Sequence, residues 1–233
     1  LDWQATKAKY QPLLARLTDR NELNDIFMQM MGELDSLHSQ VRGGDLPKDP
    51  DAAKGASLGA RLQQTSDGVK IAHIYRNDPE LPSQASPLSR IEVDAKEGDV
   101  LLAINGTPVD NVADVTRLLR NQQDKQVLLE LKRGSQSHKT VVMPVSTLVD
   151  GQLRYLDWVN HNAGIVTEAS KGKIGYLHLY AMGGGDIESF AREFYTNYDK
   201  DGLIIDVRRN RGGNIDSWII EKLLRRAWAF WQP

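Results

Sequence analysis

The chain has 233 residues, 40% of them hydrophobic, and a formal net charge of -2. This length is enough for one large domain or two small ones, and the hydrophobic share is ordinary for a globular protein with buried cores. Basic and acidic residues are interspersed, which argues against the basic stripe of a nucleic-acid-binding surface. Cysteine is absent, so disulfides, thiol catalysis and cysteine-based zinc sites are excluded.

No apolar run approaches the roughly 20 residues that cross a bilayer, so we expect no membrane partner. No signal peptide is visible, so we expect a cytoplasmic protein. The alternative is a periplasmic protein, if a signal peptide precedes the chain. We expect no metal and no cofactor. The chain begins at Leu1 without a methionine, and "EKLLRRAWAFWQP" ends it as an amphipathic helical pattern without a closing element. We therefore expect an interior piece of a longer parent protein.

Residues 1–46 are predicted to be helical, because apolar residues recur there at helical spacing. These residues are Leu13, Leu14, Leu17, Leu23, Ile26, Phe27, Met30 and Met31. Thr18 or Asp19 is the expected N-cap of a helix that has Glu22 near its third position. A Gly-Gly-Asp turn closes the region, and the polar stretch "LPKDPDAAKGAS", with its two prolines, is typical of a linker.

Residues 55–146 have a different pattern, in which short β-rich runs dominate. The runs are "LGARLQQ", "VKIAHIY", "DVLLAING", "QVLLELKR" and "HKTVVMPV", and one helix, "NVADVTRLLRNQ", lies between the third and the fourth. Asn105-Gly106 predicts a tight turn between apolar strands. Short strands with few helices favour a small barrel or sandwich.

Residues 147–233 alternate strand and helix. "GKIGYLHLY" and "GLIIDVRR" are predicted strands, the second of the continuous apolar, buried kind, and "DIESFAREFYTNYD" and "NIDSWIIEKLLRRAW" are predicted helices. This order favours a parallel sheet with covering helices, the start of an α/β subdomain. The whole chain is therefore predicted to be an α+β multidomain protein.

The stretch "DVRRNRGGNID" contains the first candidate site, because a buried strand ends there and a helix begins. Backbone N–H groups at Gly212 and Gly213 would point toward the helix N-terminus and could hold developing negative charge, as an oxyanion hole must. The alternative is that these glycines only permit a tight turn from strand to helix.

His38, in "GELDSLHSQVRGGD", is the second candidate. It is predicted near the end of a helix-like run, where it is either a general base or a histidine that faces solvent and the helix dipole. The other four histidines are assigned ordinary settings: His73 and His138 in the β-rich region, His161 in a loop, and His178 in a strand. No downstream serine stands in an obvious nucleophile setting.

In their order along the chain, these segments resemble the tricorn-type serine peptidases, relatives of the carboxy-terminal processing peptidases. "DWQATKAKYQPLLARLTDRNEL" resembles the helical subdomain of that family, and "GELDSLHSQVRGGD" resembles its motif with the base histidine. Residues 55–146, from "SLGARL" to "VVMPV", resemble a PDZ domain. "LDWVNHNAGIVTEASKGKIGYLHLYAMG" and "GLIIDVRRNRGGNIDSWIIEKL" resemble the start of the α/β subdomain.

The resemblance implies that His38 is the general base and that the Gly213 amide is part of the oxyanion hole. Two positions depart from the family pattern. Leu37 stands where the archaeal enzymes have a serine that polarises the histidine, and Ser36 is one residue earlier. Arg211 replaces the first glycine of a glycine triplet.

The family's nucleophilic serine and partner glutamate belong to later segments, so we expect this chain alone to be inactive. The parent is then a serine endopeptidase or oligopeptidase that acts on peptides, and its homo-oligomeric assembly stays open. Trp231 stands near the position of an acidic specificity residue, so a preference for basic side chains is not implied. The alternative is a catalytically inactive PDZ scaffold that binds peptides.

The stretch "GASLGA" resembles the carboxylate-binding loop of a PDZ domain. The resemblance implies that Leu58, Gly59 and Ala60 offer backbone N–H groups to a peptide C-terminus, which adds as a strand to an exposed sheet edge. The alternative is that the loop only starts a strand and that the domain braces the catalytic parts.

Overall fold

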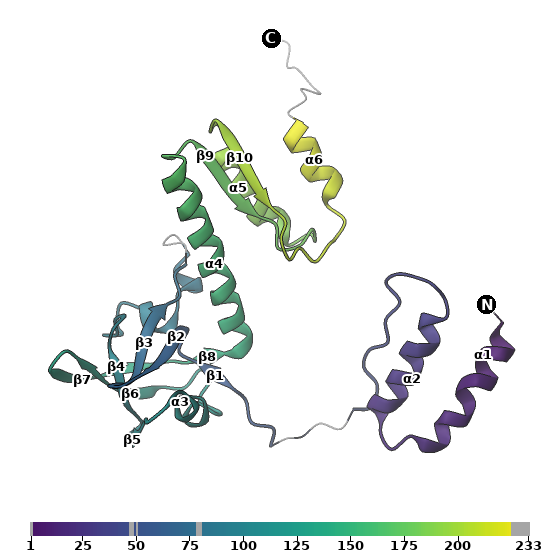
Figure 1. The fold of residues 1–233 in the computed structure, drawn as a ribbon, viewed down its shortest axis with the longest axis horizontal. Helices are drawn as coiled ribbons and strands as arrows, with labels where there is room; N and C mark the ends of the chain where they lie inside the picture. The colour runs from purple at the N-terminus through teal and green to yellow at the C-terminus, as the bar shows by residue number, and fades with distance from the viewer. Residues whose placement is uncertain (1, 47–48, 50, 78–80, 225–233) are drawn as a thin grey trace, which may run out of the picture. The chain divides into compact units, whose positions relative to one another are not determined.

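A computed structural model of the chain describes residues 2–46, 49, 51–77 and 81–224. The chain divides into two compact units, Leu1–Ala52 and Ala53–Pro233, and each is described by itself (Figure 1). Among the described residues, no helix is long and apolar enough to cross a membrane.

The first unit consists of helix α1 (Trp3–Tyr10), a 3-10 helix η1 (Gln11–Arg16) and helix α2 (Arg20–Gly32). Asp19 is the N-cap of α2, because its side chain accepts a hydrogen bond from the Glu22 backbone N–H. The Glu22 carboxylate accepts in turn from the Thr18 backbone N–H at 2.6 Å. The predicted helix start is thus confirmed, with Asp19 rather than Thr18 as the cap.

The predicted helix over the rest of 1–46 is wrong, because α2 ends at Gly32. Asp and Ser side chains compete with helical hydrogen bonds, and "GELDSLHSQ" contains one aspartate and two serines within a few residues. The chain turns back instead, with positive φ at Asp35 and His38. Asn24 Nδ2 on α2 then donates to the Gly43 carbonyl at 3.0 Å, which holds the Gly-Gly-Asp turn.

The second unit begins with an antiparallel sheet in the order β2-β3-β4-β6-β7, with β5 paired to β4. The strands are β2 (Ala60–Thr65), β3 (Gly68–Ile74), β4 (Val100–Ile104), β5 (Thr107–Pro108), β6 (Val127–Arg133) and β7 (Gln136–Val142). The 3-10 helices η2 (Pro82–Gln84) and η3 (Pro87–Ser89) follow β3, and helix α3 (Val112–Leu118) precedes β6. Each of the five predicted strands and the predicted helix is present.

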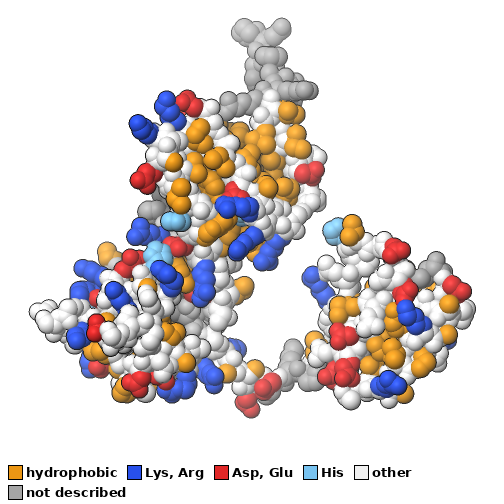
Figure 2. Space-filling model, viewed as in Figure 1, with side chains coloured by type: hydrophobic (Ala, Val, Ile, Leu, Met, Phe, Trp, Pro, Cys, Tyr) orange, Lys and Arg blue, Asp and Glu red, His pale blue; other side chains and the backbone are white. Residues whose placement is uncertain are grey.

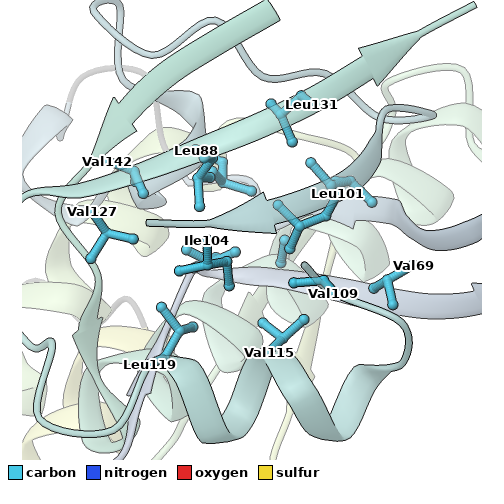
Figure 3. Packing of buried hydrophobic residues seen from close by; sticks show 14 residues of the cluster. Val69, Leu88, Leu101, Ile104, Val109, Val115, Leu119, Val127, Leu131 and Val142 are labelled. Carbon is cyan, nitrogen blue, oxygen red and sulfur yellow. The ribbon is translucent and has the colours of Figure 1, made fainter. Parts of the chain in front are cut away.

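The core of this sheet is formed by alternate strand residues and by α3 (Figure 3). Val127, Leu129 and Leu131 on β6 are completely buried, because a strand sends every second side chain to the same face. Asn105 and Gly106 both have positive φ in the turn between β4 and β5, as their sequence predicted.

Strand β1 (Ala56–Ser57) pairs antiparallel with β8 (Val145–Ser146), so the chain enters and leaves this domain at one place. Helix α4 (Thr147–Ala169) starts directly after β8, with the Ser146 side chain as its N-cap. Sequence analysis did not predict this helix and placed His161 in a loop, which is wrong. Its pattern of apolar residues is interrupted by glycines and asparagines, and the helix packs against β9 as well as against β1 and β8.

The last part has the predicted order of strand and helix: β9 (Ile174–His178), α5 (Asp186–Asn197), β10 (Gly202–Asp206) and α6 (Asp216–Leu224). Strands β9 and β10 are parallel, as predicted. Leu177 and Leu179 face α5 and α6 in a core with Phe190, Phe194, Ile215 and Ile219. The alternate residues Tyr176 and His178 face α4.

Strand β10 is less buried than its sequence predicted. Among the described residues it pairs only with β9, and Ile204 remains 45% exposed. Figure 2 shows hydrophobic side chains gathered on the surface of the part formed by β9, β10 and the helices beside them. The exposed ones include Val207, Ile220, Leu223 and Leu224. The structure confirms the α+β fold class, and the three-part division at 1–46, 55–146 and 147–233 stays a prediction.

Candidate active site and peptide-binding groove

The Gly212–Gly213 turn is tied to the segment after β9. Met182 N donates to the Gly212 carbonyl at 2.8 Å, and Asn214 N donates to the Met182 carbonyl at 2.7 Å. Gly213 has a φ of 150°, and a Cβ built there would lie 2.0 Å from the Met182 carbonyl oxygen. Only glycine therefore fits this position.

The two glycine amides of this turn differ in their hydrogen bonds. The Gly212 N–H donates to Asn210 Oδ1 at 2.7 Å. The Gly213 N–H finds no acceptor among the described residues, and Gly213 is exposed. An oxyanion hole requires an N–H that is rigidly held and has no other acceptor. Of the two glycine amides, that of Gly213 is therefore the candidate donor.

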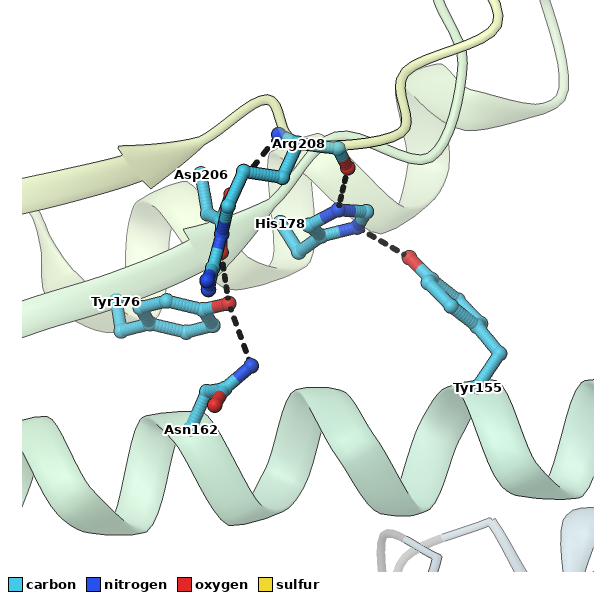
Figure 4. A network of polar contacts seen from close by, with 6 residues as sticks. All are labelled: Tyr155, Asn162, Tyr176, His178, Asp206 and Arg208. Carbon is cyan, nitrogen blue, oxygen red and sulfur yellow. Dashed lines mark hydrogen bonds and ion pairs between the residues drawn. The ribbon is translucent and has the colours of Figure 1, made fainter.

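A network of polar side chains lies beneath the strand that leads to this turn (Figure 4). The Arg208 guanidinium donates to both carboxylate oxygens of Asp206, and the Tyr176 hydroxyl donates to Asp206 Oδ2 at 2.7 Å. The Arg208 hydrogen bonds hold the pKa of the Asp206 carboxyl well below its usual range. Burial and the bond to Asp206 raise the pKa of Tyr176 to about 12. Asp206 is therefore a fixed anion that orients Arg208.

His178 joins this network from the last position of β9. Its Nε2 lies 2.7 Å from the Arg208 carbonyl oxygen, and its Nδ1 lies 2.8 Å from the Tyr155 hydroxyl. A carbonyl can only accept, so Nε2 carries a proton, and in the neutral ring Nδ1 then accepts from Tyr155. Burial raises the pKa of Tyr155, which keeps its hydroxyl protonated as a donor. His178 thus holds the chain just after β10.

Sequence analysis did not identify His178 and Tyr155 as partners. A buried strand histidine has no local motif, and Tyr155 belongs to the helix that was not predicted. Among the described residues, no group of three or more His, Asp or Glu side chains is arranged to hold a metal ion.

His38 lies in an exposed turn with a φ of 67°. Leu37 beside it is 87% exposed, and the Ser36 hydroxyl donates weakly to the Leu37 carbonyl at 3.3 Å. His38 belongs to the first unit and Gly213 to the second, so their proximity stays a prediction. Trp228 and Trp231 lie outside the described residues.

A groove of about 490 Å³ lies between strand β2, which is an edge of its sheet, and helix α3. Its walls are mostly apolar, with Leu58, Leu62, Val115 and Leu119 among the lining residues. An edge strand beside a helix can accept an extended peptide as an additional strand.

The loop Leu58–Gly59–Ala60, predicted to bind a carboxylate, borders one end of this groove. Gly59 has a φ of 71°, and a Cβ built there would lie 2.6 Å from Pro87 Cδ. Its N–H is already used, because it donates to the Ser57 hydroxyl oxygen at 3.1 Å. The binding role of the three loop residues stays a prediction.

Three family descriptions match the chain in the order in which the units and elements occur. The tricorn protease C1 domain matches residues 1–32, the tricorn protease PDZ domain matches 56–150, and peptidase family S41 matches 173–230. A crystal structure of the tricorn protease superposes with a TM-score of 0.86 and 28% identity over 99% of this chain and 22% of that chain. The chain belongs to the tricorn-type peptidases.

Relatives of the tricorn type include a putative tricorn-like protease C-terminal subunit of Sulfurisphaera tokodaii, 35% identical over 98% of this chain and 26% of the relative. Tricorn protease homolog 1 of Streptomyces coelicolor is 32% identical over 97% of this chain and 21% of the relative. This tricorn-type chain therefore spans about a quarter or less of the length of these relatives. It carries a PDZ domain and a segment that matches peptidase family S41.

Proposed function

We propose that residues 1–233 supply the general base, His38, and one oxyanion-hole donor, the Gly213 amide, of a tricorn-type serine peptidase that hydrolyses peptides. The nucleophilic serine and its partner glutamate belong to other parts of the parent protein. The nucleophile and base of a serine peptidase need only meet in space, so separate segments can supply them.

The observation that carries this proposal is the unused N–H of Gly213. The Gly212 carbonyl before it accepts from the Met182 N–H, and the Asn214 N–H after it donates to the Met182 carbonyl. Its φ and its close approach to Met182 admit no other residue. In acyl transfer, such an amide donates to the oxygen that becomes negative when the serine attacks. His38 takes the serine proton and returns it to the leaving amine.

The test is a hydrolysis assay with residues 1–233 alone and a mixture of fluorogenic peptides. We expect no turnover, because the base and the amide lack a nucleophile. Turnover that survives repurification and disappears in a His38→Ala variant would show that the chain is complete as a catalyst, and the proposal would be wrong.

The groove beside β2 supports a second candidate function, the binding of an extended peptide. We propose that the PDZ domain holds a peptide there by strand addition, because β2 leaves one edge unpaired within the described sheet. If the parent is instead a scaffold without catalytic activity, peptide binding would be its sole activity. Hydrolysis by the intact parent, abolished by His38→Ala, would exclude the scaffold.

Compartment and assembly are proposals of the same kind. We propose that the parent protein is cytoplasmic, with the periplasm as the alternative. We also propose that the parent can assemble as a homo-oligomer. Cell fractionation and sedimentation of the intact parent decide both.

A further inference from the structure

Arg211 lies in the turn that leads from β10 to the proposed oxyanion donor, two residues before Gly213. Its backbone N–H donates to the Tyr180 carbonyl at 3.1 Å. The side chain of the preceding residue, Asn210, donates from Nδ2 to the Leu179 carbonyl at 2.7 Å. The chain at Arg211 is therefore tied to the segment that follows β9, which fixes the point from which the arginine side chain extends.

The guanidinium of Arg211 lies over an aromatic ring and has no acceptor. Its Cζ lies 4.9 Å from the centre of the Tyr180 ring, and that ring lies 4.9 Å from the ring of Tyr155 on α4. A cation–π contact restrains the charge but uses none of its N–H groups. In the part of the chain that the structure describes, no acceptor or carboxylate is bound to this guanidinium. Arg211 is thus an exposed cation with a restrained position and unused donors.

The other two arginines of the same turn differ from Arg211. Arg208 lies over the Trp158 ring with its Cζ 5.2 Å from the ring centre, but the Asp206 carboxylate compensates its charge. Arg209 is exposed and contacts neither a ring nor an acceptor among the described residues. Figure 2 shows Lys and Arg side chains gathered where β9 and β10 lead into their loops. Within this positive turn, only Arg211 combines a free charge with a restrained position.

We propose that Arg211, held by Tyr180, binds the side-chain carboxylate of an Asp or Glu residue close to the scissile bond, so that the parent prefers acidic peptides. This inference rests on the proposed function, in which the Gly213 amide receives the oxygen of the scissile carbonyl. Two residues of the chain span at most about 7 Å, and an extended substrate advances about 3.3 Å per residue. The guanidinium is therefore within reach of substrate side chains near that carbonyl, and its fork matches the two oxygens of a carboxylate.

A substrate side chain, rather than a peptide C-terminus, is the anion that this position favours. The scissile carbonyl of an endopeptidase substrate lies inside the peptide, so the backbone on both sides of it consists of uncharged amides. A negative charge beside Arg211 then comes from a side chain. A lysine or arginine at the same substrate position meets a like charge, which lowers its affinity.

The test uses the intact parent and a peptide that it cleaves, chosen from an internally quenched pool. The peptide is blocked by an N-terminal acetyl group and a C-terminal amide. Gln, Glu or Lys is placed in turn at each of the three positions on either side of the scissile bond. Gln and Glu have nearly the same shape, so the ratio of kcat/KM for the Glu peptide to that for the Gln peptide measures the effect of the charge.

We expect this ratio to be about ten at one or more of these positions, the effect of one charge-assisted hydrogen bond. Lys peptides should be cleaved more slowly than Gln peptides. High salt should lower the preference for Glu, because Arg211 is exposed to solvent. Arg211→Gln should bring the ratio to about one, and Arg211→Glu should invert the preference in favour of Lys. Arg209→Gln removes the same charge from the same turn and should retain the preference.

Two variants of Tyr180 test whether the ring holds the arginine. Tyr180→Phe keeps a ring beneath the guanidinium, so the preference for Glu should remain. Tyr180→Leu removes the ring and should lower the preference, because the guanidinium is no longer restrained. Circular dichroism and thermal unfolding check that each variant is folded.

The outcomes separate this inference from the proposed function. Hydrolysis at equal rates for Glu and Gln peptides at every position would overturn the role of Arg211 and leave the proposed peptidase intact. So would a preference that persists in Arg211→Gln, or one that appears only when the blocking amide is replaced by a free carboxylate. Hydrolysis of no peptide at all would overturn the proposed function and this inference together.

Discussion

Gly212 and Gly213 are neighbours in one turn, yet the structure assigns them different constraints. A Cβ at Gly212 meets no atom within 4 Å, whereas a Cβ at Gly213 collides with the Met182 backbone. The N–H of Gly212 is bonded to Asn210, and the N–H of Gly213 is unused. The two positions therefore form a matched pair for testing the proposed oxyanion hole.

We predict that Gly213→Ala in the intact parent lowers kcat by about 100-fold or more, the usual loss when one oxyanion donor is removed. The turn must shift away from Met182 to accommodate the methyl group, and the amide moves with it. Gly212→Ala should keep most of the activity and lose about 1–2 kcal/mol of stability, because its φ of 76° is left-handed. Steady-state kinetics and urea unfolding measure both. Wild-type kcat in Gly213→Ala would contradict the proposed role.

Asp206 predicts a pH dependence of stability. Its pKa is lowered in the folded state by the Arg208 guanidinium, so its carboxylate stabilises the fold above the unfolded pKa of about 3.9 and loses this effect as the pH falls through the folded value. Asp206→Asn should cost about 1–3 kcal/mol at pH 7, since Tyr176 and Arg208 lose a charged acceptor. As the pH falls from 5 to 3, the difference in unfolding free energy between the variant and the wild type should shrink. Urea unfolding at each pH measures this difference. A constant difference would argue against the ion pair.

Helix α4 connects the six-stranded sheet of the second unit with the β9–β10 sheet through its side chains. Asp157 Oδ1 lies 2.8 Å from His73 Nε2 on β3, and Asp150 bonds Ser57. From another face of the helix, Tyr155 bonds His178 and Asn162 Nδ2 donates to the Tyr176 hydroxyl at 3.4 Å. The helix therefore holds both the PDZ groove and the strand that precedes the Gly213 turn.

We predict that Tyr155→Phe destabilises the second unit by about 1–2 kcal/mol, because the buried His178 Nδ1 loses its donor. Tyr195→Phe, an exposed tyrosine on α5, should be neutral. Urea unfolding measures both, and the ring nitrogen resonances of His178 should shift in the first variant alone. Equal stability of the two variants would show that the bond contributes nothing.

At the scale of the whole molecule, the catalysis proposed for the parent would use His38 of the first unit and Gly213 of the second. His38 has an exposed side chain and a positive φ, so its substitution should change activity without affecting a core. We therefore expect a substitution of His38 to lower the activity of the parent and to leave the stability of either unit unchanged.

We predict that His38→Ala in the intact parent lowers kcat by about 10⁴-fold or more, as for other removed members of a serine peptidase triad. His161→Ala, an exposed histidine on α4, should be unchanged and serves as the matched control. Thermal unfolding should be alike in both variants. Near wild-type turnover in His38→Ala would exclude this residue as the base.

The sequence by itself predicted the elements whose information is local. Five of the six strands of the PDZ sheet, the Asn105–Gly106 turn and the order β9-α5-β10-α6 follow from alternation, turn residues and helical spacing. It also singled out Gly213 and His38 and the family to which the chain belongs. These features depend on neighbours within a few residues, or on motifs in a fixed order along the chain.

Tertiary structure alone decided that residues 147–169 form one helix and which atoms meet around each site. Met182 excludes a side chain at Gly213, His178 holds the Arg208 carbonyl, and Asp150 reaches the PDZ loop through Ser57. These partners are separated by 31, 30 and 93 positions, where the third pair spans the whole PDZ sheet. Hydrogen bonds and close contacts between such distant residues exist only after the chain has packed, and no local pattern of polar or apolar residues encodes them.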